Sequence, residues 1–180
     1  MTKIISALFE TYADAERSVT QLEAADIPNT DISLVTGDVE ASNSFERDVV
    51  AGAGAGAALG GVGGVLAGLA LLTAPGVGQV VAAGWIAAAL VGATMVAGAT
   101  TGAVVGAGAG GAIGSLTEAG FPSSESHLYA EALRRGRSLV AVRVADEREG
   151  EVRAILAKFP SLDPSTVRSA YEAEGWAGPA

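Results

Sequence analysis

Charged residues divide the chain into two polar flanks and one long apolar middle. Residues 49–117 run for sixty-nine positions without an Asp, Glu, Lys, Arg or His, and Ala and Gly supply most of their length. All 20 acidic and 11 basic side chains therefore lie in residues 1–48 and 118–180. We expect these two flanks to form the halves of one α+β domain, with residues 49–117 as a separate apolar insert.

The N-terminal flank has the pattern of a strand, a helix and a second strand. Residues 3–9 are rich in Ile and Leu and too few for a helix. Thr11 is placed to cap a helix, and residues 31–36 form the next short apolar run. The apolar positions between them recur at helical spacing: Ala15, Val19, Leu22 and Ala25.

The C-terminal flank repeats the strand, helix, strand order after one preceding helix. That first helix covers about 123–135, capped by Ser123 or Ser124, and residues 138–144 alternate like a strand. Asp146 is placed to cap a further helix, and residues 166–171 are the predicted last strand. The buried face of the helix after Asp146 is predicted to be Val152, Ile155, Leu156 and Phe159.

Taken together, the flanks predict two β-α-β units, which is the split ferredoxin-like arrangement. The apolar insert falls between the second and third strands of that arrangement. Because both strands belong to one sheet, the insert has to leave and return on the same side. This favours a hairpin, in which an even number of arms run out from the sheet and back to it.

Glycine recurs at every fourth position in two runs of the apolar insert. On an α-helix this spacing places the glycines on one stripe, at a cost of about 1 kcal/mol each relative to alanine. Close approach of another backbone along the stripe offsets that cost. The pattern predicts a glycine-zipper helical hairpin with arms at about 50–72 and 94–116, a turn at 73–78 and a linking helix at 77–91. The predicted oligomerisation residues are Gly52, Gly56, Gly60, Gly64, Gly68, Gly98, Gly102, Gly106, Gly110 and Gly114.

Three environments are compatible with this insert. Each arm is long enough for a bilayer core, although its strongly apolar side chains are few. The alternative is burial of the arms between subunits of a soluble assembly. The sequence AGAGAGA at 51–57 also suits a silk-like stack of strands. We expect the partners to be further copies of the chain and membrane lipid, at the cytoplasmic side of the cell membrane or in the cytoplasm.

Candidate chemistry changes this picture little. The net charge of −9 disfavours nucleic acid, and the absence of cysteine excludes thiolate chemistry and cysteine-based metal sites. Gly106, Gly108 and Gly111 match a dinucleotide motif but lie inside the zipper pattern, without the βαβ context that the motif requires. His127 is the single histidine, and the acids at 146–151 crowd a predicted helix start. We expect no enzyme activity, no catalytic residue, no cofactor, no metal and no small-molecule ligand.

Several segments resemble one known family. They are FETYADAERSVTQLEAADIP at 9–28, DISLV at 31–35, APGVGQVVAAG at 74–84 and HLYAEALRRGRSLVAV at 127–142. With the Gly/Ala insert, the chain resembles the general stress protein 17M-like family, which includes bacterial heat-induced stress proteins. The resemblance implies a stress-associated bacterial protein with a ferredoxin-like domain around a glycine-zipper insert, and it implies no activity or cofactor.

Three functions follow as hypotheses. The first is a structural protein that self-associates through the zipper at the membrane. The second is a soluble shell or filament with the arms buried between subunits. The third, which rests on fold analogy alone, is a regulatory binding module.

Overall fold

The computed structural model describes residues 2–38, 70–74, 77–88, 111–118 and 120–177, and the structural statements below concern those residues. Their strands are β1 (Thr2–Phe9), β2 (Ile32–Thr36), β3 (Ala70–Ala74), β4 (Gly78–Gly84), β5 (Ser138–Ala145) and β6 (Ser161–Leu162). Their helices are α1 (Tyr12–Ala24), α4 (Gly111–Glu118), α5 (Ser123–Arg134), α6 (Glu149–Leu156) and α7 (Pro164–Ala173).

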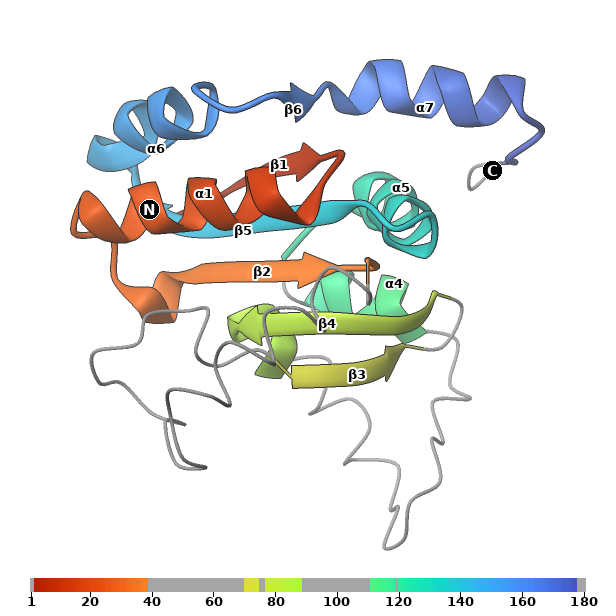
Figure 1. The fold of residues 1–180 in the computed structure, drawn as a ribbon, viewed down its shortest axis with the longest axis horizontal. Helices are drawn as coiled ribbons and strands as arrows, with labels where there is room; N and C mark the ends of the chain where they lie inside the picture. The colour runs from red at the N-terminus through yellow and green to blue at the C-terminus, as the bar shows by residue number, and fades with distance from the viewer. Residues whose placement is uncertain (1, 39–69, 75–76, 89–110, 119, 178–180) are drawn as a thin grey trace, which may run out of the picture.

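The structure is of the α+β class, as predicted. The strands form one six-stranded antiparallel sheet in the order β3-β4-β2-β5-β1-β6 (Figure 1). β5 lies between β1 and β2, and its register runs from Thr2↔Ala145 to Phe9↔Ser138 on the β1 side. The two strands of the N-terminal flank are therefore joined through a strand of the C-terminal flank.

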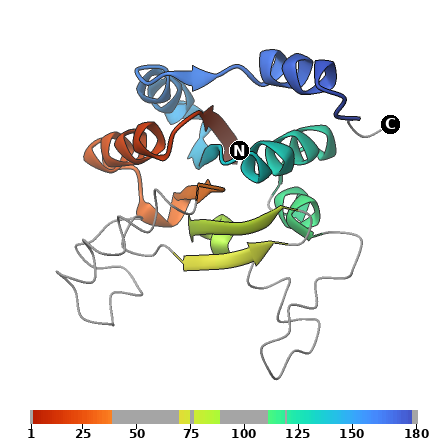
Figure 2. The same ribbon diagram turned by 45° about the vertical axis from the view of Figure 1, so that its right-hand side comes forward.

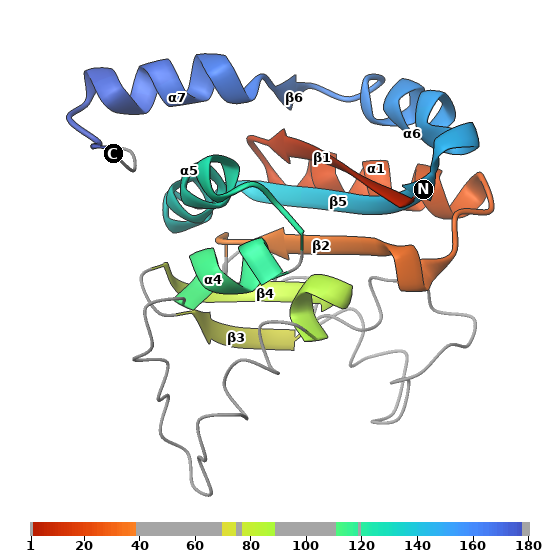
Figure 3. The ribbon, with the colours of Figure 1, turned by 180° about the vertical axis from the view of Figure 1, so that it is seen from behind.

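Helices cover both faces of the sheet and create two cores. β5 contributes to both because its side chains alternate, as the sequence pattern predicts: Leu139 and Ala141 enter one core, and Val140 and Val142 enter the other. α1 and α6 close the second core, whereas α4 and α5 lie on the opposite face, seen in front in Figure 3. In Figure 2, α7 (blue) lies above α5 (teal). Val167 and Tyr171 of α7 are buried in the first core.

The predicted start of the first helix is confirmed. The Thr11 side chain accepts a hydrogen bond from the Asp14 backbone N–H at 3.2 Å, which satisfies one of the unpaired donors of the first turn of α1. The strands predicted at 3–9, 31–36 and 138–144 are confirmed within one or two residues.

Two predicted helix caps are wrong. The N-cap of α5 is Pro122, and neither Ser123 nor Ser124 caps the helix with its side chain. Asp146 does not cap α6, because residues Asp146–Arg148 form a 3₁₀ turn and Arg148 is the N-cap. The predicted buried face of α6 is confirmed for Val152, Ile155 and Leu156, and Phe159 packs half-buried after its end.

The last predicted strand, at 166–171, is also wrong, because these residues lie in α7. The Asp163 carboxylate accepts from the Thr166 backbone N–H at 3.1 Å, and Pro164 occupies the first turn, where its missing N–H costs nothing. Val167 and Tyr171, four positions apart, then face the core as one helical stripe. The last strand is instead the two-residue β6, beside the end of β1.

Part of the predicted helical hairpin is wrong as well. Residues 70–74 form β3, where the pattern predicts the end of an arm and the start of the turn. Residues 78–84 form β4, where it predicts a linking helix at 77–91, and of that predicted helix residues 85–88 are helical. The predicted turn between them is confirmed in position, since Ala74 pairs with Gly78. The end of the second arm agrees with α4. The rest of the predicted hairpin, at 49–69 and 89–110, lies outside the described residues.

Candidate interaction surface

The β3–β4 hairpin joins the apolar segment to the sheet of the flanks. Register pairs run from Ala70↔Ala82 to Ala74↔Gly78, and Gly78 has a φ of +108° directly after the turn. On its other side β4 pairs with β2, from Ser33↔Gly84 to Thr36↔Val81. The described part of the apolar segment is therefore continuous with the folded flanks.

The end of β4 is fixed by a close backbone contact with β2. Gly84 has a φ of +82°, and a Cβ built on it would lie 2.2 Å from the Ile32 carbonyl oxygen. The Ser33 hydroxyl donates to the Ala83 carbonyl at 2.6 Å and accepts from the Ile86 N–H at 3.2 Å. Because Ser33 is fully buried, these bonds satisfy polar groups that water does not reach.

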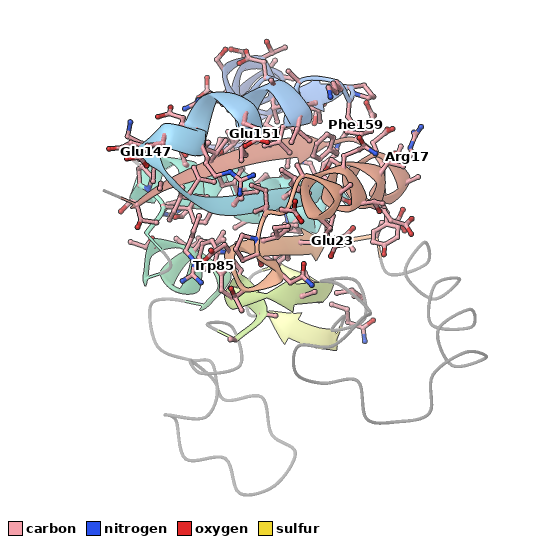
Figure 4. All side chains as sticks on the ribbon, turned by 90° about the vertical axis from the view of Figure 1, so that its left-hand side faces the viewer. Arg17, Glu23, Trp85, Glu147, Glu151 and Phe159 are labelled. Carbon is pink, nitrogen blue, oxygen red and sulfur yellow. The ribbon has the colours of Figure 1, made fainter. Side chains whose placement is uncertain are left out.

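Trp85 follows this contact and ties the hairpin to three other segments. Its indole N–H donates to the Asp31 carbonyl at 3.3 Å. The Arg143 guanidinium lies 4.9 Å from the centre of its ring, within cation–π range, and donates to the Thr30 carbonyl at 2.8 Å. On the α5 side, Phe121 stacks on Trp85 with ring centres 6.2 Å apart. Figure 4 shows Trp85 close to β4, whereas Glu147 lies in the turn before α6 and Glu151 in α6.

The aromatic contacts continue from Phe121 through Tyr129 to strand β1. Tyr129 meets Phe121 edge to face at 5.6 Å, and its hydroxyl shares a hydrogen bond of 2.9 Å with the Ser6 hydroxyl. Burial raises the pKa of Tyr129 to about 12, so its phenol stays protonated at neutral pH. These contacts favour a structural role for Tyr129 over acid–base chemistry.

One of the ten predicted zipper glycines lies among the described residues. Gly114 is in α4, and no described atom lies within 4 Å of a Cβ built on it. Leu116 of the same helix is 2% exposed and enters the core, and the Thr117 hydroxyl lies 3.2 Å from that of Ser126 in α5. The structure therefore anchors the end of the predicted second arm on α5. The other nine glycines, from Gly52 to Gly68 and from Gly98 to Gly110, lie outside the described residues.

The three arginines around the end of α5 are engaged with carboxylates. Glu131 is 8% exposed and accepts from Arg134 at 2.6 and 2.8 Å, and the Arg134 bond lowers the pKa of this carboxyl. The Arg135 guanidinium also lies 3.9 Å from the centre of the Tyr171 ring and so holds α7. The ion pairs are Arg134–Glu131, Arg135–Glu131, Arg135–Glu174 and Arg137–Glu10.

The remaining polar candidates show no assembled reaction centre. Lys3 pairs with Glu149 at 2.8 Å and with Asp146 at 3.4 Å, so part of the acidic group serves to join β1 to α6. His127 is half-buried in α5. Within the described ranges, no three His, Asp or Glu side chains are arranged to hold a metal ion.

The sequence pattern identifies only part of the group of side chains around Trp85. Trp85 stands out as the one large side chain of the apolar segment suited to an interface, but its partners Arg143 and Phe121 carry no local signal. Arg143 approaches Trp85 because β5 and β4 both pair with β2, and Phe121 approaches it from the segment between α4 and α5. The contacts of Trp85 with Arg143 and Phe121 can therefore be recognised only once the pairing of β4 with β2 is known.

Comparison of the chain with known protein families, with curated proteins and with solved structures finds no match. Over the described residues, no helix combines the length and apolar character needed to cross a membrane.

Proposed function

We propose that this protein is a non-enzymatic, stress-associated bacterial protein that associates with copies of itself through residues 49–117. The observation that carries the proposal is the distribution of charge. Every charged side chain lies in the flanks, and the charge-free segment is attached to one end of their sheet. Contiguous apolar surface is usually removed from water by a partner or a membrane.

A ferredoxin-like domain formed by the flanks is part of this proposal. β1-α1-β2 and β5-α6-β6 are two β-α-β units, and the order β2-β5-β1-β6 interleaves them. α1 and α6 contribute to the same core, which also supports this assignment. The stress-related role rests on the family resemblance of the sequence alone.

In the proposed function the zipper glycines bring copies together at the cytoplasmic membrane. Gly114 supports this assignment, because no described atom lies within 4 Å of a Cβ built on it and a close neighbour could therefore approach the backbone of α4 there. The other nine positions enter the proposal through their spacing.

A soluble shell or filament is the second candidate, and a specific observation favours it. Val80, Ile86 and Leu116 of the apolar segment are no more than 2% exposed, within the core of the domain. Part of the segment's apolar surface is thus removed from water by the chain's own fold, without lipid.

Fractionation with and without detergent, followed by light scattering on a sizing column, tests the proposal. We expect oligomers in the wild type and smaller particles after Gly60→Leu or Gly106→Leu. Gly150→Leu is the matched control, because Gly150 is exposed in α6 and a Cβ there meets no described atom within 4 Å. A monomeric wild type would refute self-association. Unchanged size and membrane partitioning in both zipper variants would refute the zipper, and the need for detergent separates the membrane from the soluble assembly.

A further inference from the structure

The two ends of the sheet differ in how they are protected. β6 is only two residues long, and a very short edge strand is one of the ways in which proteins avoid unwanted pairing. β3 at the other end is five residues long, Ala70–Ala74, and β4 is its one sheet neighbour among the described residues. The backbone groups on its outer side are the ones that a further strand would use.

Among the described residues, β3 carries none of the side-chain devices that usually protect an edge strand. Its sequence, ALLTA, contains no charge and no proline, and residues 70–88 as a whole contain no charged side chain. Lysine, inward-pointing charge, proline and bulges are the devices that normally prevent edge-to-edge pairing. An edge strand without these residues is free to pair with a further strand, so the sequence of β3 is typical of a strand that has such a partner.

We infer that β3 pairs antiparallel with β3 of a second copy of this chain, about a two-fold axis at Leu72. This inference rests on the proposed self-association and names the outer edge of β3 as one interface between the copies. The chain's net charge of −9 opposes contact between acidic flanks, whereas the charge-free hairpin presents no like charge to its copy. Among the described residues, a second copy therefore meets the fewest like charges at the β3–β4 hairpin.

The length of β3 sets the register of the pair. With Leu72 opposite Leu72 of the second copy, Leu71 lies opposite Thr73 and Ala70 opposite Ala74, so that all five residues of each strand have a partner. Any shift leaves residues unpaired at both ends. Such a two-fold interface is self-complementary and closes as a dimer.

Cysteine cross-linking of the full-length protein tests this register, because the chain has no cysteine of its own. Opposed residues of an antiparallel pair have Cα atoms about 4.5–5.5 Å apart, within the range of a disulfide. We expect Leu72→Cys to form a disulfide-linked dimer by itself under mild oxidation. Leu71→Cys alone should cross-link at least tenfold more slowly, and a mixture of Leu71→Cys with Thr73→Cys should give the mixed dimer.

A charge placed at the edge gives a second readout. Leu72→Lys would set two like charges opposite one another and is expected to weaken association about fivefold to tenfold. Gln79→Lys is the matched control, since Gln79 is exposed on β4, one strand inside the edge, and adds the same charge. Circular dichroism spectra of both variants are the check that each of them is folded.

The outcomes separate this inference from the proposed function. An oligomeric wild type in which Leu72→Cys does not cross-link, or cross-links no faster than Leu71→Cys, overturns the β3 pairing and leaves self-association standing. A monomeric wild type overturns both. Selective cross-linking at Leu72 with weakened association of Leu72→Lys supports the pairing.

Discussion

Gly84→Ala tests most directly whether the apolar segment is built into the sheet of the flanks. A Cβ at this position would lie 2.2 Å from the Ile32 carbonyl oxygen and 2.8 Å from the Ser33 Cα, both of which belong to backbone and cannot rotate away. The residue also has a φ of +82°, which costs a non-glycine residue about 1–2 kcal/mol. Relieving the overlap adds about 1–3 kcal/mol, as for other overpacked sites.

Gly136→Ala is the control that isolates the overlap. Gly136 has a φ of +81° at the end of α5, but a Cβ there meets no described atom within 4 Å, so only the conformational cost applies. We expect Gly84→Ala to lower the free energy of unfolding in urea by about 1–3 kcal/mol more than Gly136→Ala. For a chain of this length, that difference corresponds to a Tm lower by about 2–12 °C. Equal losses in the two variants would show that β4 does not lie against β2.

Three further predictions concern the side chains around this junction. Glu131→Gln should cost about 1–2 kcal/mol, because it weakens bonds to arginines that remain partly solvated. Because the pKa of Glu131 is lower in the fold than in the unfolded chain, its ion pairs stabilise the fold above pH about 4.5, and this contribution is lost as the pH falls through the folded pKa. The unfolding free energy of the variant, measured in urea at several acidic pH values, should therefore fall less with decreasing pH than that of the wild type. Tyr129→Phe should cost about 0.5–1.5 kcal/mol at neutral pH. It should also reduce the loss of unfolding free energy between pH about 10 and 12, measured by urea unfolding at several pH values, because the phenol ionises at lower pH in the unfolded chain than in the fold. Trp85→Phe should lose the bond to Asp31 and most of the contact with Arg143, about 1–2 kcal/mol in urea unfolding; an unchanged stability would contradict that geometry.

Local patterns predict the flanks well wherever periodicity and a cap agree. Strand β5 is recognisable because SLVAVRV alternates and its two sides enter different cores. The residues of α7 alternate in a similar way, so that the pattern of TVRSAY at 166–171 predicts a strand where the structure has a helix. The stronger signal is the Asp163–Pro164 pair, a side-chain cap followed by a residue suited to the first helical turn.

The apolar segment is harder to predict because its composition fits several structures. Glycine at every fourth position predicts the two helical arms, and the apolar residues between them are predicted as a linking helix. GQVVAAG in that linking region instead forms β4, with β-branched residues between two glycines of positive φ. Nothing local distinguishes these alternatives. Long-range pairing with β2 and the buried hydroxyl of Ser33 decide the strand, and both depend on residues about 50 positions away in sequence.

The placement of the junction limits how any assembly of this protein can be arranged. The described chain stops after residue 38 and resumes at β3, and it stops again after residue 88 and resumes at α4. The undescribed runs 39–69 and 89–110 therefore rejoin the described residues at β3 and at α4. β1, which pairs with the acids of α6 through Lys3, lies four strands from β3, or roughly 19 Å at the usual strand spacing. Exposed charges more than about 8 Å apart are largely screened at physiological ionic strength. The acids of α6 therefore contribute little repulsion between copies that meet at β3, and the same arrangement would hold them away from a membrane that receives the apolar segment.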